Sequence, residues 1–268
     1  MDPLSNVFSL LKHGSDGVVP SDWDLVRDWQ DKGCASAVGY SAARCSDDLR
    51  DSGAMKKTFG LELPESLAEL VDARRCALIV YDMQVGIIRQ IQDGGAVTEQ
   101  VKKILDAARR AGMRVFFTRH LSLPKELMGA SQYRMAMAWQ RVKDPEQVKP
   151  WFLRDSEGFQ IVPELAPQDT EAVFDKLAMS AFEGTPLEMA LHDCGVRSFL
   201  IVGVALEIGI DITCRHAADL GFIPVVVRDA CGAGHAEAAE RAIETLKFLG
   251  DSVISETDAV SGAMEAGK

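Results

Sequence analysis

Several short apolar runs in this chain are continuous rather than alternating, and stretches with helical periodicity separate them. The five longer runs occupy 76–82, 114–120, 171–176, 198–204 and 223–229, and a shorter one occupies 252–256. Strands that are apolar on both faces are typical of parallel sheets that helices cover on both sides. The helical stretches lie near 96–111, 185–194, 206–220 and 236–249. The sequence therefore predicts a doubly wound α/β fold.

Residues 1–63 differ in composition from the rest of the chain. They are rich in Gly, Ser and Asp and contain only brief apolar runs. We expect an N-terminal arm of loops and short helices over 1–63 and one domain over 64–268. The arm could cover this domain or a partner subunit, and Met55 could be an alternative start.

The charge of the chain excludes some classes of partner. The formal net charge is −11, whereas nucleic acids and anionic membranes select basic surfaces. No apolar run approaches the roughly 20 residues that a membrane-spanning helix needs, and the N-terminus lacks a basic-then-apolar leader pattern. We therefore expect a cytoplasmic protein that acts on a small molecule, with neither nucleic acid nor membrane as partner.

The cysteines and histidines do not predict a metal or redox site. None of the six cysteines forms a C-x-x-C pair, so a zinc knuckle or a dithiol motif is not expected. His120 ends a predicted strand, but the next histidine, His192, falls inside a helix in another part of the fold. The sequence predicts no metal and no cofactor.

Polar residues follow the predicted strands at their carboxyl ends, where the site of a doubly wound domain lies. Asp82 follows the first apolar run, and Lys176 ends the third. A carboxylate at the end of a buried strand is partly desolvated, which suits it to proton transfer. A lysine beside it would stay charged and control its ionisation. We predict that Asp82 and Lys176 are catalytic.

A long insertion over 121–170 follows the second strand and is rich in aromatic residues and methionine. One interpretation is a helix that packs on the sheet, with a loop closing over it. The other is a lid or pocket wall that selects the substrate, since long loops above strand ends often carry such walls. The insertion contributes Tyr133 and Trp139 to the residues expected to bind substrate.

Three segments together resemble the isochorismatase-like hydrolase family: CALIVYDMQ at 76–84, VFDKLAMSAFEGTPLE at 173–188 and IVGVALEIGIDIT at 201–213. The resemblance covers about 74–255 and implies a six-stranded, mainly parallel sheet and a homodimer or homotetramer. Most members of the family cleave amides with an Asp–Lys–Cys triad. When the chain is aligned with the family through its G-V-A sequence at 203–205, Gly209 falls at the position of the family's cysteine. The resemblance thus implies an acid and a lysine without the nucleophile.

The same resemblance assigns further residues to the site. It implies a cis peptide bond before Ala205 and an oxyanion pocket made by the N–H groups of Ala205 and Gly209 at a helix N-terminus. We also expect substrate contacts from residues in the three segments, at the end of the second strand and in the insertion, namely Gln84, Arg119, His120, Tyr133, Trp139 and Phe182.

Two other side chains on the third segment, Cys214 and Glu207, are candidates for a catalytic role. Cys214 lies five residues beyond Gly209, rotated by roughly 140° and about 7.5 Å along the helix, so we reject it as a replacement nucleophile. Glu207 lies in the first turn, where it either caps the helix or acts as a second catalytic carboxylate. The isochorismatases proper carry a histidine at the position of Glu207, which leaves the substrate open.

The sequence analysis thus favours a hydrolase of a small organic molecule that works without a thiol. In the first hypothesis Asp82 protonates a vinyl ether on carbon, Lys176 tunes that acid, and water adds to the cation. In a second, Asp82 or Glu207 activates water against an amide or ureide. A third is a catalytically inactive homologue that only binds a ligand.

Overall fold

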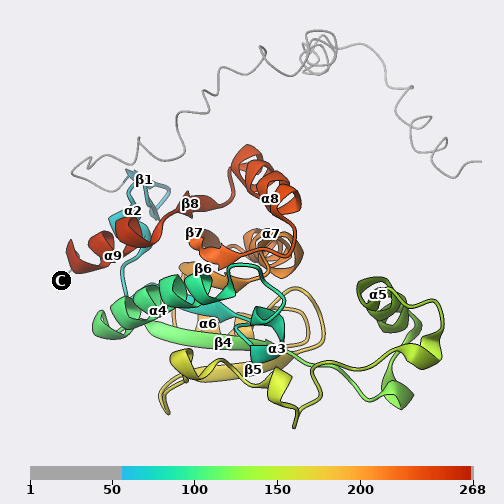
Figure 1. Ribbon diagram of the computed structural model, residues 1–268. Helices are drawn as coiled ribbons and strands as arrows, with labels where there is room; N and C mark the ends of the chain where they lie inside the picture. The colour runs from blue at the N-terminus through green and yellow to red at the C-terminus, as the bar shows by residue number, and fades with distance from the viewer. Residues whose placement is uncertain (1–55, 267–268) are drawn as a thin grey trace, which may run out of the picture. The chain divides into compact units, whose positions relative to one another are not determined.

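The computed structural model describes residues 56–266, and its core is a six-stranded sheet in which every strand pair is parallel (Figure 1). The strand order is β5-β4-β3-β6-β7-β8. The strands are β3 (Cys76–Tyr81), β4 (Arg114–His120), β5 (Ala172–Lys176), β6 (Ser198–Val204), β7 (Ile223–Gly232) and β8 (Val253–Ser255). The predicted fold class and the six predicted strands are confirmed.

Helices cover both faces of the sheet. On one face α2 (Leu67–Leu70), α4 (Gly94–Arg110) and α9 (Thr257–Ala266) contribute to one apolar core. On the other face α6 (Leu187–Asp193), α7 (Asp211–Asp219) and α8 (Ala236–Leu249) contribute to a second. The strands between these layers are apolar on both faces because each face meets a core, as the continuous apolar runs indicated.

Some elements differ from the sequence predictions. The helix expected over 206–220 is a π-helical turn, η7 (Leu206–Ile210), followed by α7. Helix α9 and the single turn α3 (Val85–Ile88) were not predicted. Most of the predicted N-terminal arm lies outside the described residues, as does Met55. Residues 56–63, its last part, form a hairpin of β1 (Lys56–Thr58) and β2 (Leu61–Leu63).

The helix of the insertion after β4 does not pack on the sheet, although Val162 and Leu165 near the end of the insertion belong to the core. Its helix α5 (Ala130–Gln140) has no buried residue, and Figure 1 shows it projecting away from the strands. Four short 3-10 turns surround it along the chain: η3 (Lys125–Leu127), η4 (Pro145–Gln147), η5 (Glu157–Phe159) and η6 (Pro163–Leu165). The interpretation of a helix with its apolar face on the sheet is wrong. Only α5 and its neighbouring turns stand apart from the sheet, whereas the segment from Phe159 to Leu165 is anchored in the core.

The end of β6 lies unusually close to β3. The register between β6 and β7 shifts between Ile201 and Gly203, and Gly203 has a φ of 120°. A Cβ at this position would lie 2.0 Å from the Tyr81 carbonyl oxygen. Only glycine can therefore bring β6 this close to β3 where the two strands end.

A partly buried ion pair links the residue before the edge strand β5 to helix α4. The Arg109 guanidinium donates to both carboxylate oxygens of Glu171 at 2.8 Å each, and to the Ala166 carbonyl oxygen at 3.0 Å. The Glu171 side chain is only 5% exposed, so loss of its partner would leave a buried charge unpaired.

Arg109→Leu is therefore expected to lower the free energy of unfolding by about 2 kcal/mol. The matched control is Arg110→Leu at the exposed neighbouring position, for which a change below about 0.5 kcal/mol is expected. Urea denaturation monitored by circular dichroism measures both. Equal midpoints for the two variants would show that the ion pair does not hold this edge of the sheet.

Candidate active site

A buried ion pair occupies the carboxyl end of the sheet. Asp82 directly follows β3, and Lys176 is the last residue of β5, so the lysine reaches across β4. The Lys176 Nζ lies 2.7 Å from Asp82 Oδ2, and the Thr118 hydroxyl donates to Asp82 Oδ1 at 2.7 Å. Lys176 also donates to the Ala178 carbonyl oxygen at 3.2 Å. The two predicted residues thus meet, with Thr118 of β4 between their strands.

Burial controls the charge of the lysine. The side chains of Lys176 and Asp82 are 0% and 5% exposed. Desolvation lowers the pKa of Lys176, and the attraction of Asp82 only partly opposes this effect. Asp82 adopts a φ of 48°, a left-handed conformation that few residues other than Gly, Asn and Asp adopt. Such backbone outliers concentrate at functional sites.

A cavity of about 300 Å³, here called the main cavity, opens beside this pair. Its floor is formed by Asp82, Tyr81, Ala205 and Gly209 at the ends of β3 and β6. Its walls are mainly apolar and include Ile87, Ile91, Trp139, Trp151, Phe152, Met179 and Ile208. Such a cavity suits a small molecule with an apolar body.

Gly209 stands at the position where the nucleophile was expected to be missing. The space beside it is occupied by the side chain of Tyr81 on β3. A Cβ on Gly209 would lie 1.9 Å from the Tyr81 hydroxyl oxygen and 2.4 Å from its Cζ. The tyrosine ring also lies under the Lys176 ammonium, with Nζ 4.3 Å from the ring centroid. The space that a side chain at position 209 needs is therefore occupied by an aromatic ring.

The backbone at the start of η7 has the cis peptide bond that the resemblance implies, between Val204 and Ala205. The Gly209 N–H, expected to be half of an oxyanion pocket, donates to the Ala205 carbonyl oxygen at 3.0 Å. The N–H groups of Ile208 and Ile210 point to the same oxygen, at 3.3 and 3.2 Å. In this conformation the π-helical turn itself uses the Gly209 donor.

His120 lines the main cavity as a neutral imidazole. Burial is the main cause that lowers its pKa to about 4; the Asp82 carboxylate opposes this shift, and the Lys176 ammonium adds to it. Its Nδ1 is buried and has no hydrogen-bond partner among the described residues. The ring meets Phe152 edge to face at 5.9 Å between centroids.

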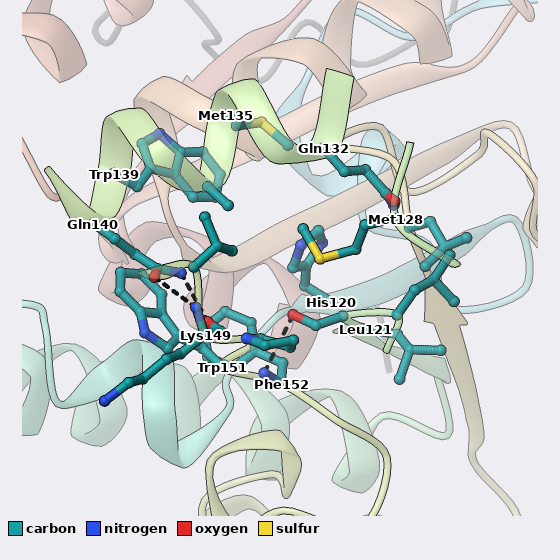
Figure 2. A pocket seen from close by; sticks show the side chains of 16 residues that line it. His120, Leu121, Met128, Gln132, Met135, Trp139, Gln140, Lys149, Trp151 and Phe152 are labelled. Atoms are coloured by element: carbon teal, nitrogen blue, oxygen red, sulfur yellow. Dashed lines mark hydrogen bonds between the residues drawn. The ribbon is translucent and has the colours of Figure 1, made fainter. Parts of the chain in front are cut away.

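A smaller cavity of about 50 Å³ adjoins the main one and shares four residues with it, His120, Trp139, Trp151 and Phe152. Figure 2 shows Trp139 and Met135 of α5 on one side of this side cavity and Trp151 and Phe152 on the other. The Gln140 amide exchanges hydrogen bonds with the Lys149 backbone at 2.8 and 2.9 Å. The insertion thus forms a wall of both cavities. That this wall selects the substrate stays a prediction.

Gln84 lies outside the main cavity, so a direct contact with substrate is not supported. It is fully buried. Its Nε2 donates to the carbonyl oxygens of His120 and Phe159 at 3.0 Å each, and its Oε1 accepts from the His120 N–H at 2.6 Å. The side chain instead fixes the backbone that carries His120.

Three other predicted contact residues also lie outside both cavities. Arg119 alternates with His120 along β4, so it points away from the main cavity and pairs with Asp175 at 2.7 Å.

Tyr133 and Phe182 are engaged elsewhere. The Tyr133 hydroxyl donates to the Lys125 carbonyl oxygen at 3.0 Å. Phe182 packs in the core against Phe199, His216 and Phe222. Only Trp139 and His120 of the six predicted contacts line the main cavity.

Glu207 acts as a clamp on the turn before α8. Its Oε1 accepts from the backbone N–H groups of Gly234 and His235, at 2.8 Å each. It is not among the residues that line the main cavity, whereas Gly234 is. Glu207 thus holds the turn before α8 rather than capping its own helix, and because it does not line the main cavity, a role as a second catalytic carboxylate is not supported.

The sequence analysis missed several residues that form the site. Thr118 lies two residues before His120, and strand alternation places both on the same face. Tyr81, Trp151 and Met179 also line the main cavity or its floor. Tyr81 had no local signal, because an aromatic residue at the end of an apolar run is typical of any buried strand.

Neither a metal cluster nor the thiol of Cys214 offers an alternative reaction centre in the described part of the chain. Residues 56–266 hold no cluster of three or more His, Cys, Asp and Glu side chains able to bind a metal ion. Cys214 is fully buried, and desolvation raises its thiol pKa well above the usual value. No helix in the same part of the chain is long and apolar enough to cross a membrane.

Comparison with known proteins identifies a family and individual relatives of this chain. Residues 76–258 match the model of the Isochorismatase domain family. The ureidoacrylate amidohydrolase RutB of Klebsiella pneumoniae is 27% identical over 204 residues, covering 70% of this chain and 86% of RutB. The isochorismatase family protein YwoC of Bacillus subtilis is 26% identical over 179 residues, 67% of this chain and 87% of YwoC.

Solved structures share the fold. A cysteine hydrolase from Pseudomonas syringae superposes with a TM-score of 0.64 at 20% identity, covering 81% of this chain and 100% of that one. An isochorismatase family protein from Burkholderia thailandensis gives a TM-score of 0.59 at 26% identity, covering 72% and 96%. The first of these, below 25% identity, supports the fold alone.

A parallel α/β domain with a small-molecule cavity at the carboxyl ends of its strands defines the general class of this protein. Within that class, the chain belongs to the isochorismatase family and is a hydrolase.

The role of Gln84 leads to a stability prediction. Gln84→Leu removes three hydrogen bonds and leaves buried backbone groups unpaired, which is expected to cost about 2–4 kcal/mol of unfolding free energy. Gln168→Leu, at an exposed position with no side-chain hydrogen bond among the described contacts, is the control and is expected to be neutral. Chemical denaturation that gives equal stabilities for both variants would contradict the role assigned to Gln84.

The buried imidazole leads to a pH prediction. His120 has a folded pKa of about 4 against an ordinary value of 6.5, so between these values the unfolded chain binds more protons. Stability is therefore expected to rise with pH across this window, by about 1 kcal/mol per pH unit from this group. His120→Gln and His120→Phe should both reduce that slope in urea titrations at several pH values. An unchanged slope in both would mean that the imidazole is not kept neutral by burial.

Proposed function

We propose that this protein hydrolyses a small, largely apolar molecule by acid catalysis, without a covalent intermediate, and that Asp82 is the proton donor. The observation that carries this proposal is the buried Asp82–Lys176 pair, whose Asp82 lines a cavity in which the nucleophile position is a glycine. The family's hydrolase chemistry supports the reaction class. A vinyl ether is the substrate type that fits such a site.

The ion pair can supply the proton. Burial lowers the pKa of Lys176, which weakens the hold of its nitrogen on the proton shared with Asp82 across 2.7 Å. The proton moves from Lys176 to Asp82 and then to the terminal carbon of the substrate, leaving an oxocarbenium ion. Water adds to the cationic carbon, and the hemiketal collapses to a ketone and an alcohol. The proton that water loses returns to the Asp82–Lys176 pair.

The surroundings favour a reaction that develops positive charge. The Asp82 carboxylate faces a cavity with aromatic walls, and aromatic faces attract cations. A reaction that develops an oxyanion would need free backbone donors, and one of the two expected donors, the Gly209 N–H, already bonds to the Ala205 carbonyl oxygen. Vinyl ether cleavage therefore fits this geometry better than attack on a carbonyl group.

The cavity also bears on the charge of the substrate. None of the described residues that line the main cavity is Lys or Arg, and Arg119 is engaged by Asp175 outside it. A dianion such as isochorismate would have no free cation to bind. We therefore place an uncharged or singly charged vinyl ether with an apolar body ahead of isochorismate itself.

Hydrolysis of an amide or ureide is the second candidate. The relative RutB is named as a ureidoacrylate amidohydrolase, and Asp82 could activate a water molecule against such a carbonyl group. Because Glu207 clamps the turn at Gly234, Asp82 alone would have to serve as the base. The engaged Gly209 N–H makes this candidate the weaker one.

The test compares vinyl ether and ureide substrates in D₂O. The probes are isochorismate, phenyl vinyl ether and an N-carbamoyl amino acid, with pyruvate, phenol and ammonia as readouts. Protonation on carbon by Asp82 places one deuterium in the methyl group of the carbonyl product, which mass spectrometry detects. Wild-type turnover of a vinyl ether with this label supports the proposal, whereas ureide turnover alone supports the second candidate.

Asp82→Asn is expected to reduce turnover at least about 100-fold, because an amide cannot replace a proton donor of this kind. Cys214→Ala is the matched control and should keep nearly full activity, since Cys214 lies in the core on α7. Circular dichroism establishes that both variants are folded. Retained turnover in Asp82→Asn would refute the assigned role. Binding of a probe without turnover by the wild type would favour the inactive homologue instead.

A further inference from the structure

We propose that Tyr81 is the residue that commits this site to non-covalent chemistry, because its ring occupies the volume that a nucleophilic side chain at position 209 would need. The inference deepens the proposed function and rests on it for the reaction class. Tyr81 is the last residue of β3, directly before Asp82. In the sequence Tyr81 is adjacent to the acid Asp82. In the structure its ring also lies against Gly209.

The two positions exclude each other sterically. A Cβ at Gly209 would lie 1.9 Å from the Tyr81 hydroxyl oxygen, 2.4 Å from Cζ and 2.6 Å from Cε1. Contacts below 3.0 Å are essentially never seen for a real Cβ. The clash involves ring carbons as well as the hydroxyl oxygen, so removal of the hydroxyl alone would not relieve it.

The ring cannot move aside at low cost. Its hydroxyl donates a hydrogen bond to the Met179 carbonyl oxygen, and the residue is only 1% exposed. The Lys176 ammonium lies 4.3 Å from the ring centroid on one face, while the ring belongs to the core under η7 and α7. Displacing the ring would break this hydrogen bond and disturb the ion pair of Lys176 with Asp82.

Tyr81 does not itself replace the nucleophile. Burial, with smaller contributions from Asp82, raises its pKa well above the ordinary phenol value, so the hydroxyl stays neutral and serves as a donor to Met179. Tyr81 is thus a specificity-determining residue. It fills the nucleophile position, supports the lysine and leaves water as the attacking group.

The consequence is that reaction type depends on a pair of positions, 81 and 209. Gly209→Cys alone would place a thiol where the ring already lies. Combined with Tyr81→Val, the same change would place the thiol near Lys176 and in the first turn of a helical segment, surroundings that lower thiol pKa values. Only the double variant should therefore contain a reactive thiolate.

The experiment measures thiol alkylation in the full-length protein and needs no substrate, so its outcome is independent of whether the proposed vinyl ether chemistry is correct. The variants are Gly209→Cys, Tyr81→Val/Gly209→Cys and Tyr81→Phe/Gly209→Cys. Iodoacetamide labelling at several pH values, mapped to position 209 by peptide mass spectrometry, gives the rate and pKa of the introduced thiol. The wild type reports the labelling of the native cysteines.

The double variant with valine is expected to label at least about tenfold faster at pH 7 than the single variant, with a thiol pKa below the ordinary value of about 8.5. The phenylalanine double variant is the matched control. It keeps the ring and loses only the hydroxyl, so it should label as slowly as the single variant. Equal rates in the single and the valine double variants would overturn the proposal. Fast labelling in the phenylalanine variant would assign the effect to the hydroxyl rather than the ring and would also overturn it.

A second measurement tests the same competition for space in case the cysteine variants do not fold. Gly209→Ala adds only the Cβ and is expected to destabilise the protein strongly with Tyr81 present and much less in the Tyr81→Val background. Thermal denaturation of the four members of this cycle gives the coupling. Additive effects would show that positions 81 and 209 do not compete for space, which would refute the inference.

Discussion

The ion pair between Lys176 and Asp82 is the interaction on which the rest of the site depends. Two opposite charges removed from water are tolerated only if each finds partners. Here Thr118 satisfies the second carboxylate oxygen, and the Ala178 carbonyl oxygen accepts from the ammonium. Because the pair spans three neighbouring strands, the order β5-β4-β3 is a requirement of the chemistry as well as of the fold.

Much of the fold could be predicted from the sequence, because continuous apolar runs report burial on both faces of a strand. The same reasoning brought Asp82 and Lys176 to one edge of the sheet, where the structure places them 2.7 Å apart. The insertion was harder to predict. Its methionines and aromatics indicate apolar contacts, but composition alone does not distinguish a helix packed on the sheet from a wall that stands apart from it.

The residues assigned wrongly share a physical reason. Gln84 and Glu207 are polar residues within the motif segments, so local sequence suggested roles in chemistry. Each instead satisfies backbone groups that are distant in the chain, at Phe159 and at Gly234. Tyr81 was overlooked for the opposite reason, because its importance depends on how closely η7 approaches β3. Such long-range relations leave no signature in a local pattern.

The position of the insertion has a consequence for how this protein can change over evolutionary time. The side chains that hold the acid and the lysine belong to the strands, whereas Trp139 and Trp151, which face the substrate space, belong to a segment whose helix buries no residue. Substitutions on α5 would change the shape of the main cavity with little penalty in the folding of the sheet. The separation lets selection act on substrate preference while the reaction centre stays fixed.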